Sequence, residues 1–200
     1  MRVLALDLSY VMAPSISRYG TVPTSKHVNI EKHWDCVRET LDITRFQFSL
    51  ERLSEMTKSF SKALKNVDED QVHLVQYQSD MLPTLISEDR LVIHNIDHFH
   101  DFLSGPYTGG LGIQDDGWIA ELDRLKLVDE YMWWRNRNSS GLDECFSCNC
   151  SYQEVVFAKR QPMKNPDLIV VSGSPHVVPP EAQCLFGIFE NMISAWFNSQ

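Results

Sequence analysis

The chain alternates between short apolar runs and longer stretches in which apolar residues recur every three or four positions. A run of four to eight apolar residues bounded by polar or turn-forming residues is typical of a buried strand. Such runs predict strands at 2–8, 71–77, 91–96, 128–134, 154–159 and 168–171. Spacing of three to four is typical of an amphipathic helix. This spacing predicts helices at 31–42, 47–66, 79–86, 118–127 and 179–198.

Strands and helices alternate from one end of the chain to the other. This order predicts an α/β fold: one three-layer domain over residues 1–200, with a mainly parallel sheet and helices on both faces. Two hundred residues, 43% of them hydrophobic, suffice for one domain with a real core. Apolar residues cover most of the last predicted helix, so it should pack on the sheet.

Residues 91–101, LVIHNIDHFHD, join an apolar run to a dense polar cluster. Asp97, His98, His100 and Asp101 follow the predicted strand, where open parallel sheets place their ligand sites. Carboxylate oxygens suit Mn²⁺ or Mg²⁺, and imidazole adds affinity for Mn²⁺, Fe²⁺ or Zn²⁺. The cluster therefore predicts a metal or catalytic site, against the alternative of a solvated turn.

Two other predicted strands also end in polar residues. Asp7 closes the first strand, and Ser172, Ser174 and His176 follow the last one. Because the carboxyl ends of parallel strands share one edge, these segments can converge with residues 97–101. The alternatives are a capping carboxylate at Asp7 and an ordinary solvated turn at 172–176.

Charge and apolar patterning bear on partners and location. The formal net charge of −9 argues against nucleic acid or an anionic membrane as the main partner. No apolar run reaches eighteen residues, and the amino-terminal segment makes a poor signal peptide. We therefore expect a soluble, cytoplasmic protein.

The five cysteines are an odd number, which favours free thiols or metal ligands over a disulfide framework. Cys145, Cys148 and Cys150 form a C-x-x-C-x-C pattern that predicts a Zn²⁺ site if a fourth ligand comes from elsewhere. The alternative is a set of free thiols. Residues 102–117 form a glycine-rich stretch that suits a lid or binding loop but lacks nucleotide-binding spacing.

Several segments together resemble a known family. NIDHFHD is similar to the D-x-H-x-D metal motif of the arginase-like (ureohydrolase) superfamily. More narrowly, the chain resembles the short family that includes the peptide arginases, which convert peptidyl arginine to ornithine. The segments that carry the resemblance, in order, are LALDLSY, SDML, NIDHFHD, DDGWIAEL, YMWWRNRNSS and LIVVSGSPHVVPPE.

The resemblance implies a site with two Mn²⁺ ions, at which a hydroxide attacks the guanidinium carbon and urea leaves. It implies metal carboxylates at Asp97 and Asp101. With the strand-end residues, the candidate metal ligands are Asp7, Asp97, His98, His100 and Asp101, and the catalytic candidates are Asp97, His100 and Asp101. Substrate contacts would come from Trp118, Asn138 and Ser174. The sequence departs from the family pattern where imidazoles are expected, with Phe99 two residues after Asp97 and Ser79 before Asp80.

Three hypotheses follow. The first is a metal-dependent, Mn²⁺-using hydrolase that cleaves a C–N bond of a guanidino group, free or in a peptidyl arginine, and releases urea. The second is a catalytically degenerate scaffold that acts as a binding or assembly protein, with the aromatic stretch Tyr131, Trp133 and Trp134 as a contact surface. Sheet core is the alternative role of these aromatic residues. The third is a zinc-stabilised structural domain.

Overall fold

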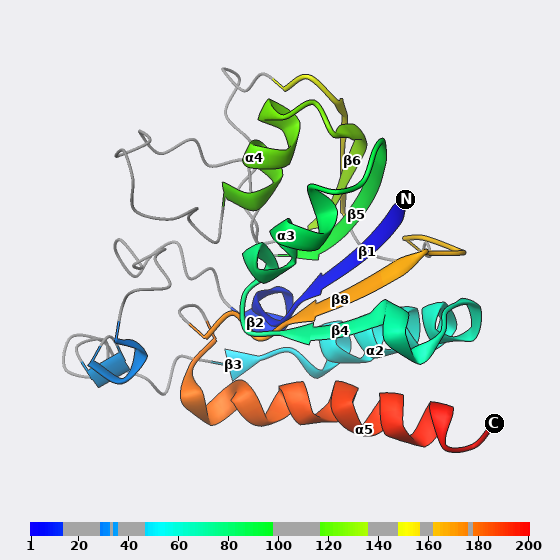
Figure 1. The fold of residues 1–200 in the computed structure, drawn as a ribbon. Coiled ribbons are helices and arrows are strands. Elements are labelled where there is room, and N and C mark those ends of the chain that lie inside the picture. The colour runs from blue at the N-terminus through cyan, green and yellow to red at the C-terminus, as the bar shows by residue number, and fades with distance from the viewer. Residues whose placement is uncertain are drawn as a thin grey trace.

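The computed structural model describes residues 1–13, 29–32, 34–35, 47–97, 117–135, 148–156, 162–175 and 178–200. Six strands form one sheet in the order β4-β8-β1-β5-β6-β7, and every neighbouring pair is parallel (Figure 1). Their bounds are β1 Arg2–Asp7, β4 Val72–Val75, β5 Leu91–Asp97, β6 Val128–Arg135, β7 Ser151–Val156 and β8 Leu168–Ser172. A separate antiparallel pair joins β2 Met12–Ala13 to β3 Gln47–Phe48.

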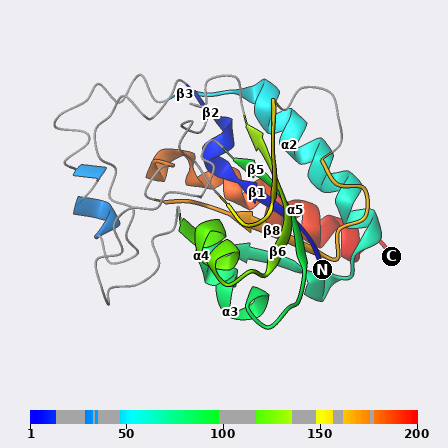
Figure 2. The ribbon, with the colours of Figure 1, turned by 90° about the horizontal axis from the view of Figure 1, so that it is seen from above.

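Helices cover both faces of the sheet (Figures 1 and 2). On one face lie α2 (Leu50–Ala63) and α5 (Phe186–Phe197), and on the other lie α3 (Leu82–Leu85) and α4 (Trp118–Arg124). Short 3-10 segments extend or join these elements. They are η1 Leu8–Val11, η4 Leu64–Asn66, η5 Glu69–Gln71, η6 Gln78–Met81 and η8 Pro180–Leu185. The predicted three-layer α/β fold with a parallel sheet is confirmed.

Each core layer follows from the alternation of side chains along the strands. In β1, Leu4 and Leu6 pack toward α2 and α5, whereas Val3 and Ala5 pack toward α3 and α4. Both sets are fully buried, because the central strands of a parallel sheet carry helices on both faces. Asp7 continues the Val3 and Ala5 face, which puts its side chain on the α3/α4 side of the sheet.

Two predicted elements begin at different residues from those expected. The helix predicted at 47–66 begins at Leu50, because the Ser49 side chain caps it by accepting the Arg52 N–H at 3.3 Å. The strand predicted at 154–159 lies at Ser151–Val156, earlier by three residues. This outer strand is largely exposed, so it does not need the apolar run on which the prediction rested.

Other predictions match more closely. In the helix predicted at 31–42, the described residues 31–32 and 34–35 are helical. The last predicted helix starts as η8 and continues as α5, whose Phe189 is fully buried against the sheet. No helix within the described ranges has the length and apolar character of a membrane span.

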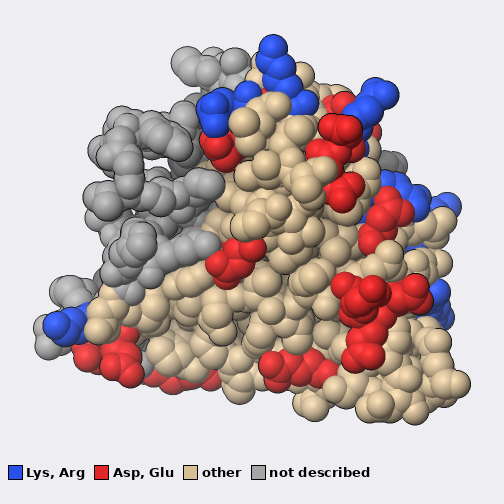
Figure 3. All heavy atoms as spheres, in the orientation of Figure 1, with Lys and Arg blue, Asp and Glu red and all other residues tan. Residues whose placement is uncertain are grey.

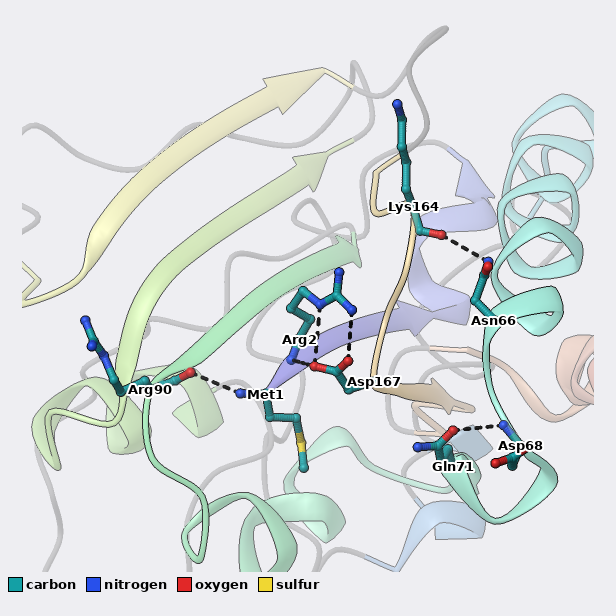
Figure 4. Close-up of polar contacts among 8 residues, drawn as sticks. All are labelled: Met1, Arg2, Asn66, Asp68, Gln71, Arg90, Lys164 and Asp167. Atoms are coloured by element: carbon teal, nitrogen blue, oxygen red, sulfur yellow. Dashed lines mark hydrogen bonds and ion pairs between the residues drawn. The ribbon is translucent and has the colours of Figure 1, made fainter.

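At the amino edge of the sheet, polar contacts tie the segment before β8 to its neighbours (Figure 4). The Arg2 backbone N–H and guanidinium both donate to the Asp167 carboxylate, at 2.7 and 2.9 Å. The Asn66 side chain donates to the carbonyl of Lys164 at 3.1 Å. Hydrogen bonds from the Arg2 side chain hold the pKa of Asp167 below its usual value.

We expect Asp167→Asn to lower the urea midpoint of unfolding slightly at pH 7 and by less at pH 3. A carboxyl whose pKa is lower in the folded state stabilises the protein above its unfolded pKa of about 3.9, and that contribution is lost as pH falls. The effect should be small and weakened by salt, because both side chains are nearly half exposed. An equal effect at both pH values would contradict a role for the charge.

Candidate functional site

The carboxyl ends of β1 and β5 lie side by side at the centre of the sheet. The next long helix after β1 is α2 on one face, and the next helix described after β5 is α4 on the other. Open α/β sheets bind ligands where two neighbouring strands lead to opposite faces in this way. The topology therefore selects this edge of the sheet as the candidate site.

Two buried carboxylates meet at this edge. Leu6 pairs with Ile96, so the following residues, Asp7 and Asp97, are neighbours, and their exposed fractions are only 3% and 2%. Ser9 connects them: its backbone N–H donates to Asp7 Oδ1 at 2.7 Å, and its hydroxyl donates to Asp97 Oδ1 at 2.5 Å. The structure thus brings together two of the predicted site residues from strands ninety residues apart in the sequence.

Asp7 also accepts hydrogen bonds from the end of β8. The hydroxyls of Ser172 and Ser174 both donate to Asp7 Oδ2. Ser172 pairs with Asp7 in the sheet, while Ser174 has a left-handed backbone with φ of 42°. Only a few per cent of residues other than glycine adopt that conformation. It is held here by a backbone hydrogen bond from the Ser174 N–H to the carbonyl of Gln76 at 2.9 Å.

Burial raises the pKa of Asp7, and hydrogen bonds from Ser172, Ser174 and Ser9 oppose that rise. All of these donors are uncharged, so they solvate the carboxylate without neutralising it. A buried carboxylate is costly unless it gains a proton or a cation. This environment therefore favours either protonation of the Asp7 carboxylate or binding of a cation to it.

A buried polar network supports the end of β5 on the same face of the sheet. The Gln78 side-chain amide donates to Asn95 Oδ1 at 2.9 Å, and the Asn95 amide donates to the Tyr131 hydroxyl at 3.2 Å. Asn95 is fully buried two residues before Asp97, and the Trp133 indole N–H donates to the Asp97 carbonyl at 3.2 Å. These contacts fix the strand end that carries the second carboxylate.

Replacing Gln78 by leucine should lower the free energy of unfolding by about 1–3 kcal/mol, because the buried Asn95 carbonyl loses this donor. Urea denaturation of the variant measures the change. Gln153→Leu is the matched control, since Gln153 is exposed on the outer strand and should change stability by less than about 0.5 kcal/mol. Equal effects from the two variants would contradict a supporting role for the network.

The donor set fits a hard divalent cation. Asp7 and Asp97 offer carboxylate oxygens, and the three serine hydroxyls around them offer further oxygens of the kind that Mn²⁺ and Mg²⁺ accept. Within the described residues, no group of three or more His, Cys, Asp or Glu side chains is placed to hold a metal. The predicted ligands His98, His100 and Asp101 lie outside the described residues. The carboxylate pair thus accounts for two of the five predicted ligands.

The other predicted residues fall in different places. Ser174 lies at the site, Asn138 and His176 lie outside the described residues, and Trp118 is 1% exposed within the α3/α4 core. The prediction that the aromatic stretch of β6 forms a contact surface is wrong. Tyr131, Trp133 and Trp134 are buried, since helices cover both faces of this inner strand and the side chains fill the core.

The cysteine pattern is described only in part. Cys145 lies outside the described residues, whereas Cys148 and Cys150 are half-buried free thiols at the start of β7. Burial raises the pKa of the Cys150 thiol, with the neighbouring Asp123 and Cys148 acting in the same direction. A raised pKa disfavours the thiolate that zinc requires. Zinc binding at these cysteines stays a prediction.

Three residues at or beneath the site did not stand out in the sequence. Ser9 follows the first predicted strand but is uncharged, and Gln78 lies between the predicted strand at 71–77 and the predicted helix at 79–86. Asn95 carries the one usable signal, since a polar residue inside a buried strand needs buried hydrogen-bond partners.

Comparisons with protein-family models, with curated proteins and with solved structures give no match for this chain. The resemblance to the arginase-like superfamily therefore stays a prediction from the sequence motifs.

Proposed function

We propose that the chain is a metal-dependent hydrolase that cleaves a C–N bond of a guanidino group and releases urea. The observation that carries the proposal is the meeting of Asp7 and Asp97, from two strands, at the buried carboxyl edge of the sheet. Burying two like charges side by side is unfavourable unless a cation or a proton compensates them. A buried carboxylate pair of this kind suits a protein that binds a cation there.

In this proposal the residues of the chain have distinct roles. Asp7 and Asp97 hold the cation, and the hydroxyls of Ser9, Ser172 and Ser174 keep the Asp7 and Asp97 oxygens aimed at it. Asp101, His98 and His100 would complete the ligand set from the segment that follows β5. When bound, Mn²⁺ lowers the pKa of water enough to supply a nucleophile at neutral pH.

The charge of the protein supports a cationic substrate. The net charge is −9, and Asp and Glu side chains form several groups across the face shown in Figure 3. Such a surface potential raises the local concentration of a cation such as a guanidinium. Free arginine and peptidyl arginine both carry that group, so both are substrates to test.

The test is urea release from arginine and from arginine peptides in the presence of Mn²⁺. We expect turnover by the wild type and by Asp70→Asn, because Asp70 is exposed in η5 ahead of β4, at the amino edge of the sheet. Asp97→Asn should reduce turnover to the level without protein. Turnover that survives in Asp97→Asn would place the chemistry elsewhere.

A second candidate function is a catalytically degenerate scaffold that binds a partner or ligand. The observation that favours it is the pair of hydroxyls, Ser172 and Ser174, which both donate to Asp7 Oδ2 and so can satisfy that oxygen in place of a cation. In that case the serines would be replacements for the cation and not its support. A wild-type protein that neither takes up Mn²⁺ nor releases urea would favour this candidate.

A further inference from the structure

Asp123 anchors the Cys148–Cys150 segment through several hydrogen bonds. Its carboxylate accepts the backbone N–H of Asn149 at 2.9 Å and that of Cys150 at 2.8 Å. The Asn149 side-chain amide donates to the same carboxylate and to the Asp123 carbonyl, both at 3.1 Å. Asp123 is 6% exposed near the end of α4, so the segment is anchored to a packed helix.

This anchoring places the two cysteine side chains together. The chain bends at Asn149 and Cys150, and the Cys148 thiol donates to the Cys150 carbonyl at 3.3 Å. Both side chains pack against the same core layer, on the α3/α4 side of the sheet. The Cys148 sulfur therefore reaches the backbone of Cys150 itself.

We propose that Cys148 and Cys150 form a redox modification site, in which a low-molecular-weight disulfide such as oxidised glutathione converts the two thiols into an intramolecular disulfide. This inference is independent of the hydrolase proposal. It also competes with zinc binding, because a disulfide leaves neither sulfur available as a thiolate ligand.

The exchange balances in two steps. The Cys148 thiolate attacks one sulfur of oxidised glutathione, which forms a mixed disulfide and expels one glutathione thiolate. Cys150 then loses its proton to solvent and attacks the Cys148 sulfur, which expels the second glutathione thiolate. Two protein thiols are oxidised, and one oxidised glutathione is reduced to two thiols.

Proximity drives the second step. Holding two reacting groups at contact raises their effective concentration far above that of free glutathione, so the mixed disulfide should not persist. Cys184 is the internal reference, because it is exposed on η8, far from this pair in sequence, and should stop at the mixed disulfide.

The experiment incubates the full chain with oxidised glutathione, quenches it with acid, alkylates the remaining thiols and maps the peptides by mass spectrometry. We expect a peptide that has lost two hydrogen atoms across Cys148 and Cys150, both in the wild type and in Cys145→Ser. In Cys150→Ser, a nearly isosteric change, one glutathione should remain attached to Cys148. Cys184 should carry glutathione in every sample.

Three results would overturn the proposal. One is a lasting glutathione adduct on Cys148 in the wild type. Another is a disulfide that involves Cys145 and disappears in Cys145→Ser without a Cys148–Cys150 bond replacing it. The third is a pair that stays reduced under conditions that modify Cys184.

Discussion

Phe60→Ala is expected to lower the free energy of unfolding by about 3–5 kcal/mol, the range for truncating a buried aromatic side chain. Phe60 is fully buried on α2, and its ring meets Phe189 of α5 edge to face with 5.1 Å between centroids. The pair joins the two helices that cover one face of the sheet, and the loss would be a large part of a typical domain's stability. Urea denaturation followed by circular dichroism measures it.

Leu50→Ala is the matched control for this prediction. Leu50 lies at the start of the same helix but is 71% exposed, so its truncation should change stability by less than about 0.5 kcal/mol. The double variant with Phe189→Ala should show a coupling energy of about 0.5–1.5 kcal/mol. Equal effects at Phe60 and Leu50, or no coupling, would contradict the packing of α5 on α2.

Asp7→Asn is expected to have opposite effects on stability and on metal binding. In the metal-free protein at pH 7 it should raise the free energy of unfolding by about 1 to 2 kcal/mol, a common gain for stabilising substitutions. Asn removes the buried charge, and its amide can still pair with Ser9, Ser172 and Ser174, because serine hydroxyls both donate and accept. In Mn²⁺ at a hundred times its Kd, the wild type should gain about 2.7 kcal/mol and the variant nothing.

The pH dependence of stability determines the sign of the effect expected for the metal-free Asp7→Asn variant. Burial raises the pKa of Asp7 in the folded state, so its contribution to stability is fully present below the unfolded pKa of about 3.9 and is lost as pH rises through the folded pKa. Near pH 3 the wild type and Asp7→Asn should therefore be equally stable. A variant that is less stable than the wild type at pH 7 would contradict this account of Asp7.

The carboxyl edge could be predicted from the sequence because it depends on strand order and strand ends. Asp7, Asp97 and Ser172 each follow an apolar run, and parallel strands bring such ends to one edge. Those predictions did not depend on contacts between side chains. The helix predicted at 47–66 is present, but it begins only at Leu50, after the Ser49 cap.

The side-chain contacts inside the site could not be predicted from the sequence and came from the structure. Ser9 bridges two carboxylates only because β1 and β5 are neighbours, a pairing that alternation of elements does not specify. The partner of Asn95 is Gln78, which lies seventeen positions earlier, on a short 3-10 segment. The burial of Tyr131 and Trp133 likewise follows from the inner position of β6, which its sequence does not reveal.

The measurement that tests the cation site most directly is the Mn²⁺ content of three proteins after incubation with Mn²⁺ and removal of the excess: wild type, Asp97→Asn and Asp70→Asn. A pair of buried carboxylates that holds a cation predicts near-stoichiometric Mn²⁺ or more in the wild type and in Asp70→Asn, and its loss in Asp97→Asn. Wild-type protein without Mn²⁺, or Mn²⁺ retained by Asp97→Asn, would contradict a metal site at the carboxyl edge of the sheet.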